Sequence, residues 1–304
     1  MKIVVMGAGG VGGYFGGRLA QAGHDVTFIA RGRHLQALRS RGLAIKSPQG
    51  DAQVEVNAVE DPAQAGTADA ILFAVKLWDT ESAAARLHPV LGANGVVVPF
   101  QNGVESIDRL KKFLPEKSVM GGAAYIAARI GEPGVIVHTG KMARLRFGAV
   151  QSVQRSAAIA LQAACRDAGF EAEVVDDIVA VLWEKFVLLV ALSGTTALAR
   201  VPIGVVRADP DLRWLLEQAM QETWQVARAR GVALPQDLVA KTMAFVDGLA
   251  PEMKSSMLGD LEAGGRLEAA WLSGAVVRMG AEAGIATPAN KAIYAGLKPF
   301  LDGR

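Results

Sequence analysis

The sequence predicts an α/β domain built on a parallel sheet, followed by a domain made only of helices. Three observations support this organisation. A glycine-rich turn joins a short apolar run to a helix near the start of the chain. Fully apolar runs typical of buried parallel strands follow at residues 70–75 and 95–100, and the βα alternation then gives way to helical segments broken by prolines. The chain of 304 residues is long enough for two domains, which we expect at residues 1–176 and 177–304.

The first strand, Lys2–Met6, leads into a glycine-rich turn with the spacing G-x-G-x-x-G. Gly7 permits a sharp turn, Gly9 lets the backbone approach a pyrophosphate, and Gly12 lets the following helix pack closely on the strand. The pyrophosphate would lie at the helix N-terminus, where unpaired N–H groups and the helix dipole favour an anion. The positions expected to contact a bound dinucleotide are Gly7, Gly9, Gly10, Val11 and Gly12.

The segment after the second strand indicates which dinucleotide is bound. Asp25–Ile29 reads as this strand, and NAD-specific sites usually carry a carboxylate near its end that holds the ribose 2′-hydroxyl. This chain has Arg31 there and no carboxylate, and a guanidinium suits a 2′-phosphate through paired hydrogen bonds. The alternative is an ordinary strand–helix turn with Arg31 as a solvated charge. The sequence therefore predicts an NADPH site.

Composition and spacing disfavour several other classes of protein. The formal net charge is +2 and no basic cluster is interleaved with aromatic residues, so a nucleic-acid partner is not expected. The single cysteine, Cys165, permits no internal disulfide and fits a small buried side chain in a reducing cytoplasm. The first strand begins at residue 2, which leaves no room for a signal peptide, and the most apolar run, 186–192, is too short to span a membrane. No metal site or serine triad is predicted, because the histidines lack zinc-like spacing; they are His24, His34, His88 and His138.

Two polar segments follow the apolar strands of the first domain. Lys76 comes directly after residues 70–75, and Gln101-Asn102 comes after residues 95–100. Because ligands of open α/β sheets gather at the carboxyl ends of the strands, Lys76 would point toward the cofactor. An amide at the second strand end can bridge the nicotinamide ribose and a substrate oxygen. A plain surface lysine and an ordinary Asn-Gly turn are the alternatives.

The remaining elements of the first domain follow from shorter patterns. The glycine-separated strands among them are expected to add an antiparallel edge to the parallel sheet. These elements are a helix over residues 79–91, short strands over 119–126, 134–139 and 144–148, a helix over 152–168 and a last strand over 172–175.

A long apolar helix opens the second domain and carries a charged pair at its centre. Within residues 178–198, Lys185, Leu189 and Ser193 are spaced four apart and share one face. Lysine is seldom fully buried without a partner, and the adjacent Glu184 faces another way. The alternative to a functional lysine is one that extends along the helix surface to solvent. Further on, Glu268 is predicted in the first turn of a helix, where the dipole alone would favour a carboxylate.

Taken together, these residues resemble the ketopantoate reductases (2-dehydropantoate 2-reductases) from end to end. Members of that family reduce a 2-oxo acid with NADPH on the route to pantothenate and coenzyme A. The resemblance implies a Rossmann N-terminal domain, an all-helical C-terminal domain and an active site between them. The segments that carry it are Gly7–Gly12, Arg31, Val75-Lys76, Gln101-Asn102-Gly103-Val104, Pro133-Gly134-Val135, Trp183-Glu184-Lys185, Ser256-Met257-Leu258-Gly259-Asp260 and Glu268.

The resemblance also implies roles for individual residues. Lys185 resembles the general acid that protonates the carbonyl oxygen, and partial desolvation would lower its pKa toward the working range. Glu268 resembles the carboxylate that orients the substrate and the lysine. Ser256 matches a substrate-binding hydroxyl, while Asn102 and Lys76 match residues that line the cofactor and the substrate. The side chains expected around the substrate are Asn102, Lys185, Leu189, Ser193, Ser256 and Glu268. A cytoplasmic homodimer is expected, because a C-terminal helical domain often provides a dimer surface.

The sequence departs from the family pattern around the substrate. Family members usually carry asparagine four and eight residues after the catalytic lysine, where this chain has Leu189 and Ser193. An aspartate and another asparagine of a later motif are replaced by Ala270 and Ser273. Losing the partner of a substrate hydroxyl costs about 1–3 kcal/mol. We therefore expect reduction of ketopantoate or, alternatively, the same chemistry on a less hydroxylated 2-oxo acid. A sensor that binds NADPH without turnover is a further alternative, which the presence of a proton donor disfavours.

Overall fold

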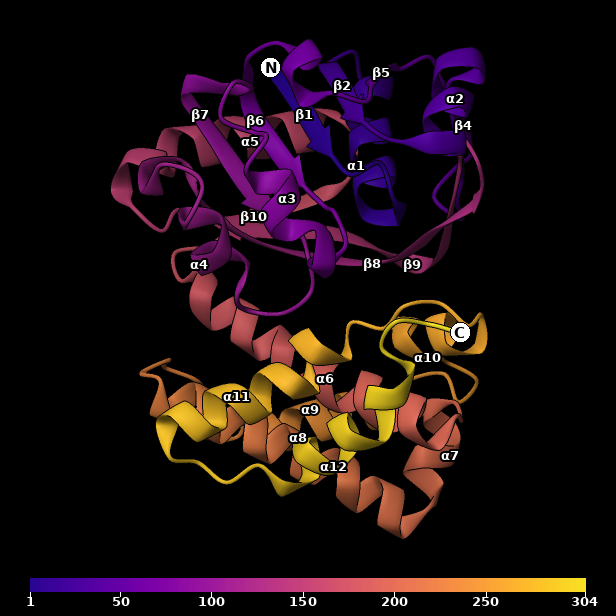
Figure 1. The fold of residues 1–304 in the computed structure, drawn as a ribbon, viewed down its shortest axis with the longest axis vertical. Helices are drawn as coiled ribbons and strands as arrows, with labels where there is room; N and C mark the ends of the chain where they lie inside the picture. Colours follow the sequence, from indigo (N-terminus) through magenta and orange to yellow (C-terminus); the bar gives the residue numbers. More distant parts are fainter. The chain divides into compact units, whose positions relative to one another are not determined.

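The structure is a computed structural model that describes residues 1–304 and divides into two compact units (Figure 1). The first unit comprises residues 1–101 and 105–178, and the second comprises residues 102–104 and 179–304. Two β-sheets and the helices that cover them make up the first unit, whereas the second contains helices and short 3-10 turns. The predicted fold class, an α/β part with a parallel sheet followed by a helical part, is confirmed.

The first sheet is fully parallel and has the strand order β5-β2-β1-β6-β7. Its middle strand, β1, pairs with β2 on one side and with β6 on the other. The chain therefore reverses its direction of winding beside β1, and the carboxyl ends of strands at such a point form the usual ligand crevice of this architecture. The strands are β1 (Lys2–Met6), β2 (Asp25–Ile29), β5 (Asn57–Val59), β6 (Ala68–Phe73) and β7 (Leu91–Pro99).

Two of the three helices predicted in the first unit are confirmed, as α1 and α5, whereas α2 and α4 were not predicted. The helix expected over residues 79–91 is wrong, because only Thr80–Ala84 is α-helical and β7 already begins at Leu91. Pro89 explains the difference, since it cannot donate a helical hydrogen bond and it disfavours helical geometry at the preceding residue. The α-helices are α1 (Gly10–Gln21), α2 (Gly32–Arg41), α3 (Thr80–Ala84), α4 (Ser106–Lys111) and α5 (Arg155–Asp167).

The second sheet has the order β10-β9-β3-β4, with β8 paired to β9. The residues predicted as three short antiparallel strands between positions 119 and 148 do form antiparallel strands, but there are two long strands, and their placement at the edge of the parallel sheet is wrong. The two strands form one long antiparallel hairpin in the second sheet, in which Gly134 lies at the turn and Gly140 lies in a bulge that shifts the pairing without ending the strand. The strands are β3 (Leu43–Lys46), β4 (Ala52–Val54), β8 (Gly121–Glu132), β9 (Val135–Gly148) and β10 (Glu171–Val174).

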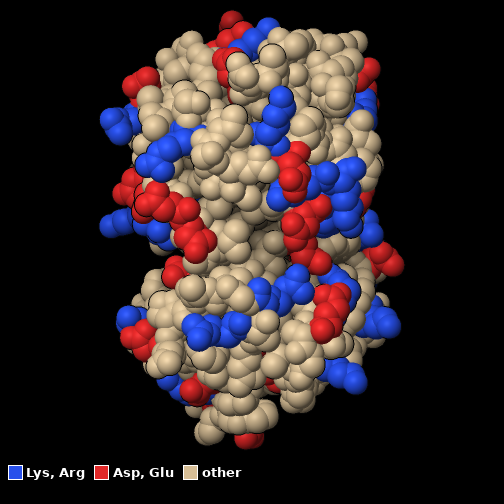
Figure 2. All heavy atoms as spheres, turned by 90° about the vertical axis from the view of Figure 1, so that its left-hand side faces the viewer, with Lys and Arg blue, Asp and Glu red and all other residues tan.

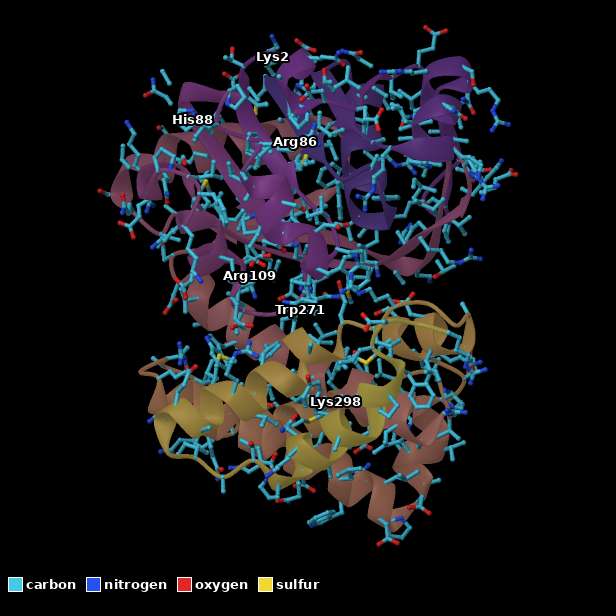
Figure 3. All side chains as sticks on the ribbon, in the orientation of Figure 1. Lys2, Arg86, His88, Arg109, Trp271 and Lys298 are labelled. Carbon is cyan, nitrogen blue, oxygen red and sulfur yellow. The ribbon has the colours of Figure 1, made fainter.

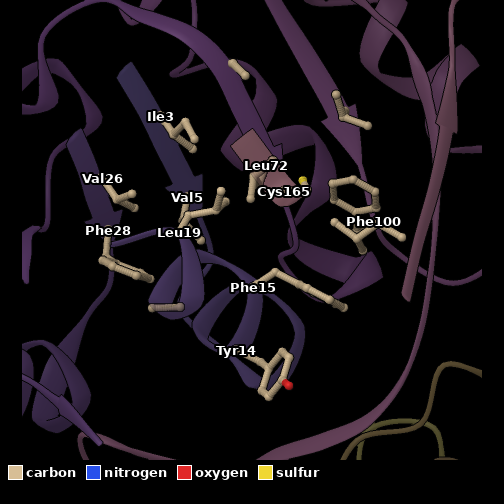
Figure 4. Close-up of a cluster of buried hydrophobic side chains, with 14 of the residues drawn as sticks. Ile3, Val5, Tyr14, Phe15, Leu19, Val26, Phe28, Leu72, Phe100 and Cys165 are labelled. Atoms are coloured by element: carbon tan, nitrogen blue, oxygen red, sulfur yellow. The ribbon is translucent and has the colours of Figure 1, made fainter. Parts of the chain in front are cut away.

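Helix α1 packs against both sheets, and its glycines explain how. A Cβ on Gly16 would lie 2.6 Å from Val5 Cγ2 of the first sheet, while a Cβ on Gly17 would lie 2.7 Å from Leu43 Cδ2 of the second. The helix therefore approaches each sheet more closely than a larger residue would allow. The buried core beside it is shown in Figure 4 and includes Ile3, Val5, Phe15, Leu19, Phe28, Leu72, Phe100 and Cys165. Burial raises the pKa of the Cys165 thiol to about 12, so this cysteine acts as a small apolar side chain.

The second unit is organised around α6 (Ile178–Ala199), which begins at the boundary of the two units. By length and composition alone this 22-residue helix could cross a membrane, but 67% of its most apolar window is buried inside the protein. Trp183, Phe186 and Val190 lie in the buried apolar cluster of this unit. Helix α6 is therefore a core helix. The others are α7 (Ile203–Ala208), α8 (Pro210–Ala229), α9 (Leu238–Asp247), α10 (Ser256–Glu262), α11 (Ser273–Ala283) and α12 (Pro288–Leu297).

One buried carboxylate of the second unit is structural. Glu222 of α8 accepts hydrogen bonds from the backbone N–H groups of Ala289 and Asn290, at 2.7 and 2.9 Å, and from the Asn290 amide at 2.8 Å. It thereby satisfies donors in the first turn of α12 and fixes that helix to α8. At the surface, positive and negative side chains are intermixed over the face seen in Figure 2.

Candidate functional site

The glycine turn lies at the carboxyl end of β1 and passes close to the segment after β6. Gly7 has φ +101°, and a Cβ there would lie 2.8 Å from the backbone nitrogen of Val75. The turn therefore tolerates only glycine at this position, for conformation and for space. Gly12, in the first turn of α1, would place a Cβ against the Gly7 carbonyl and 2.8 Å from Val5 Cγ1, so the helix sits directly on its strand.

Gly9 and Gly10 differ in their surroundings. Gly9 is the N-cap of α1, and no atom lies within 4 Å of where its Cβ would be. No side chain caps the helix and its first turn holds no acidic residue, so this end of α1 fits the pyrophosphate of a dinucleotide. A Cβ on Gly10 would instead collide with the Ala128 carbonyl of β8. The need for glycine at position 10 thus arises from packing, while Val11 packs on the apolar core of the unit.

Arg31 follows β2 as expected, but it has a partner that sequence reasoning missed. It is the N-cap residue of α2, its side chain is 78% exposed, and its Nη2 donates to Asp79 Oδ2 at 2.7 Å. Asp79 ends the 3-10 helix η2 (Leu77–Asp79), which follows β6. A carboxylate therefore contacts the same guanidinium that the sequence assigns to a 2′-phosphate. The only sequence signal was an acidic residue three positions after Lys76.

Lys76 lies where the sequence places it, just beyond β6. It is exposed, it is the N-cap residue of η2, and its ammonium lies 5.5 Å from the centre of the Trp78 ring. The segment that follows is held by Arg109 of α4, labelled in Figure 3, which donates to both carboxylate oxygens of Glu81 at 2.7 Å. Its hydrogen bonds to Glu81 lower the pKa of that carboxyl, and Arg109 also donates to the Leu77 carbonyl.

The amide pair after β7 separates into two roles. Gln101 is buried, its Nε2 donates to the Val75 carbonyl and to Thr80 Oγ1 at 2.9 Å, and its Oε1 accepts from Ser106 Oγ. Its hydrogen-bonding groups therefore tie the first unit together. Asn102 belongs to the second unit, and its amide contacts two titratable side chains of that unit.

Asn102 connects the two side chains predicted to carry the chemistry. Its Nδ2 donates to Glu268 Oε2 at 3.2 Å, and its Oδ1 accepts from Lys185 Nζ at 3.4 Å. Both groups come from distant parts of the sequence, α6 and the segment before α11. The structure thus brings together three of the residues that the sequence singled out.

Lys185 has the most strongly altered titration in this network. It lies half-buried in α6, and desolvation lowers the pKa of its ammonium from 10.5 to about 8, against the attraction of Glu268, which raises it. An amine in this range is still mainly protonated at neutral pH and can give up a proton readily. Such a group is suited to general acid catalysis.

Glu268 is not in the first turn of a helix, so that part of the prediction is wrong. It is the N-cap residue of the 3-10 turn η5 (Ala269–Trp271), whose Trp271 is marked in Figure 3. Helix α11 begins only at Ser273, because Leu272 has φ −104° and ψ −101°, which interrupts helical geometry. The carboxylate is therefore positioned by a short turn and by Asn102, and not by the dipole of α11.

The three further residues assigned to the substrate lie in unlike environments. Leu189 is half-buried, whereas Ser193 is fully buried and its Oγ has no hydrogen-bond partner. Ser256 is exposed as the first residue of α10. Its neighbour Ser255 is the buried one, and Ser255 Oγ lies 2.7 Å from Thr196 Oγ1 and caps α10 by accepting from Leu258 N–H. Within the described residues 1–304, no group of three or more His, Cys, Asp or Glu side chains is arranged to hold a metal ion.

Comparisons with known proteins cover nearly the whole chain. The model of the family described as "Ketopantoate reductase PanE/ApbA" matches residues 3–152, and that described as "Ketopantoate reductase PanE/ApbA C terminal" matches residues 177–300. A 2-dehydropantoate 2-reductase of Archaeoglobus fulgidus is 33% identical, over 96% of this chain and 95% of that protein. An uncharacterized oxidoreductase of Bacillus subtilis, YkpB, is 30% identical, over 99% of each. The crystal structure of a PanE/ApbA family ketopantoate reductase from Ralstonia eutropha JMP134 matches with a TM-score of 0.90 and 37% identity, over 99% of this chain and 98% of that one.

The two glycines of the turn are expected to respond differently to alanine. Gly7→Ala should lower the free energy of unfolding by about 1–3 kcal/mol, because alanine is strained at positive φ and meets the backbone after β6. Gly9→Ala should change it by less than about 0.5 kcal/mol, since its methyl group meets no protein atom. The Gly9 variant should nevertheless bind NADPH much more weakly. Urea unfolding and a fluorescence titration with NADPH measure the two effects, and parental affinity in Gly9→Ala would contradict the assignment.

Proposed function

Because the chain belongs to the ketopantoate reductase PanE/ApbA family, we propose that it reduces the 2-oxo group of a small 2-oxo acid with NADPH. The observation that carries the proposal is the Lys185–Asn102–Glu268 network, in which an ammonium of lowered pKa lies beside a carboxylate. NADPH supplies the hydride when bound, and the protein supplies the proton. The reaction adds both to the carbonyl group and yields a 2-hydroxy acid.

Lys185 is the proposed general acid. Its ammonium would donate a hydrogen bond to the carbonyl oxygen, which draws electrons from the carbon that accepts hydride, and would then transfer the proton to the developing alkoxide. With a pKa of about 8, the proton is present at neutral pH but held less tightly than on an ordinary lysine. This match between pKa and working pH favours a catalytic role over a plain surface lysine.

Glu268 and Asn102 are proposed to position the acid and the substrate. The negative charge of Glu268 raises the pKa of Lys185 and so keeps the amine protonated in a site whose desolvation opposes the charge. Asn102 uses its two amide ends differently, accepting from Lys185 and donating to Glu268, and thereby fixes their separation. Ser256, exposed at the start of α10, is proposed to bind the substrate carboxylate or a hydroxyl.

The first unit is proposed to hold the cofactor. The open space at Gly9 and the uncapped N-terminus of α1 fit the pyrophosphate, while Arg31 and Lys76 offer positive charge for a 2′-phosphate. Asp79 opposes that last contact, because its carboxylate already occupies Arg31 and would repel an incoming phosphate. Binding of NADPH therefore requires Arg31 to exchange one anion for another, and we propose that discrimination against NADH is correspondingly modest.

The cofactor assignment predicts opposite effects for the two members of the Arg31–Asp79 pair. Arg31→Gln should weaken NADPH binding by about tenfold or more and leave NADH within about twofold, because only the phosphorylated cofactor uses the guanidinium. Asp79→Asn should strengthen NADPH binding, since it frees Arg31 and removes a repulsive charge. Fluorescence titrations of both variants with both cofactors test this. Equal weakening of the two cofactors by Arg31→Gln would contradict a 2′-phosphate contact.

Ketopantoate is the substrate that the family assignment favours, and its reduction to pantoate would place the chain in pantothenate biosynthesis. The alternative, a less hydroxylated 2-oxo acid, is supported by the positions where the chain lacks amide side chains. Leu189 is apolar, and the hydroxyls of Ser193 and Ser273 are buried without partners. Leu189 has no hydrogen-bonding group, and the serine hydroxyls are fully buried and shorter than the asparagine side chains that the family pattern has at these positions. We propose that the enzyme takes branched 2-oxo acids with little preference for the hydroxyl group.

This substrate assignment predicts that ketopantoate and its analogue without the hydroxyl, 3,3-dimethyl-2-oxobutanoate, differ in kcat/KM by less than about tenfold, because the protein makes no hydrogen bond to that hydroxyl. Leu189→Asn, which adds an amide one helical turn from Lys185, should shift the ratio toward ketopantoate. Steady-state assays that follow cofactor absorbance measure both ratios. A preference of a hundredfold or more for ketopantoate in the parent enzyme would refute the relaxed specificity, and no turnover with any 2-oxo acid would favour the sensor.

The lowered pKa of Lys185 predicts a specific pH dependence. The acid must be protonated, so kcat/KM should fall as pH rises through about 8. Glu268→Gln removes the charge that raises this pKa, so the variant should be slower, and the fall of its kcat/KM with pH should begin at lower pH. Glu184→Gln, on the adjacent position of α6, serves as the matched control and should leave the pH of this fall unchanged. A fall at the parental pH in Glu268→Gln would show that another group donates the proton.

The setting of the enzyme is also part of the proposal. The single, buried cysteine fits a cytoplasmic protein, which we propose here. We further propose a homodimer, because Trp214 of α8 and Phe245 of α9 are large apolar side chains that remain at least half exposed in the single chain.

A further inference from the structure

A cavity of about 940 Å³ lies in the first unit, beside the C-terminal half of α1. Its wall comes from α1, from β9 and from the turn between α5 and β10, and Gln49 of the β3–β4 turn closes one side. Gly7, Gly9, Arg31 and Lys76 do not line it, so it is distinct from the region assigned to the dinucleotide. Its volume lies in the range of small-molecule sites.

The α1 side of the cavity contains a buried arginine without an acidic partner. Arg18 is only 9% exposed, and its guanidinium donates to the side-chain oxygen of Gln21 and to the carbonyl of Gly50. It also lies 5.3 Å from the centre of the Tyr14 ring. No carboxylate is within ion-pair distance of it, although buried charges are normally paired. Asp51 attracts it only at longer range and is itself bound by Lys46.

The β9 side of the cavity also contains an arginine without an acidic partner, Arg144, and Arg146 on the same strand provides a comparison. In the parallel pairing of β9 and β10, Arg144 lies opposite Glu171 just as Arg146 lies opposite Glu173. Arg146 and Glu173 form an ion pair at 2.8 Å. Arg144 forms none, stacks on the Tyr125 ring at 5.0 Å and keeps a buried Nε without a hydrogen-bond partner. The same strand register thus gives a satisfied arginine away from the cavity and an unsatisfied one at its wall.

We propose that this cavity is a second small-molecule site, which binds the phosphate or carboxylate group of an anionic ligand through Arg18, Arg144 and Lys141. Guanidinium groups bind such oxyanions through paired hydrogen bonds, and an oxyanion would supply the counter-charge that both arginines lack. The remainder of the wall defines the rest of the ligand. The proposed ligand has an apolar body that contacts Tyr14, Met142 and Phe170. Its other end is neutral or cationic and faces the carboxylates of Asp167 and Glu171.

Calorimetric titration with pyrophosphate and with succinate, at low ionic strength, tests the proposal and separates phosphate from carboxylate recognition. At least one of the two probes should bind saturably to one site per chain that persists in Gly9→Ala, since pyrophosphate has a second proposed position at the glycine turn of the parent protein. Arg144→Gln should weaken this binding by about tenfold or more. Arg18→Gln should weaken binding by a similar factor. Because Arg18 is buried, the thermal unfolding of this variant is compared with that of the parent protein. If the Arg18 variant does not fold, the half-exposed Arg144 carries the test.

Two controls keep the result specific. Arg146→Gln, on the same strand but paired with Glu173, should leave binding unchanged. Gly9→Ala, which blocks the proposed pyrophosphate position at α1, should also leave it unchanged. If neither pyrophosphate nor succinate binds saturably, the proposal is overturned. So would binding that Gly9→Ala abolishes and Arg144→Gln does not affect, because the probe would then occupy the glycine turn, which would leave the proposed reductase function intact.

Discussion

The chemistry proposed for the second unit depends on a charged amine held in the middle of an apolar helix. Lys185 lies among side chains that form the core of this unit, so the ammonium loses much of its hydration and its pKa falls to about 8. Glu268 and Asn102, which come from outside α6, oppose that loss with charge and hydrogen bonding. The compensation is incomplete. Below about pH 8 the amine is protonated in both the folded and the unfolded chain, and its burial lowers the free energy of unfolding by the full amount. Between about pH 8 and 10.5 the unfolded chain binds more protons at Lys185 than the folded chain, so this destabilisation is relieved as pH rises.

A comparable constraint organises the first unit, where α1 packs between two sheets. Close approach on both sides requires small residues at successive positions of the helix, which accounts for Gly16 and Gly17 as well as for Gly12. The same helix leaves its N-terminus uncapped at Gly9 and presents Tyr14 and Arg18 on its later turns. One element thus joins the proposed cofactor position to the proposed anion site, although each uses a different part of it.

The sequence predicted the elements whose signals are local and missed those that depend on distant partners. The glycine turn, β1, β2 and α6 were evident from spacing and apolar runs, and the fold class followed from them. The β8–β9 hairpin was divided into three strands, since Gly140 lies at a bulge and only the pairing of the strands distinguishes a bulge from a break. Asn102, Lys185 and Glu268 were named from the sequence, but their contacts join positions 83 and 166 residues apart. The Asp79 partner of Arg31 was unpredictable for the same reason, because an acidic residue in a loop carries no signal of what it will contact.

Burial lowers the pKa of the Lys185 amine and Glu268 opposes that shift, and both effects can be measured on the amine itself. NMR of protein labelled with ¹³C at the lysine side chains would follow each Cε resonance with pH, and Lys185→Met would identify the signal of Lys185 by its loss. The account predicts that this resonance titrates near pH 8, and at lower pH still in Glu268→Gln. Titration at about 10.4, as for an exposed lysine, would contradict it.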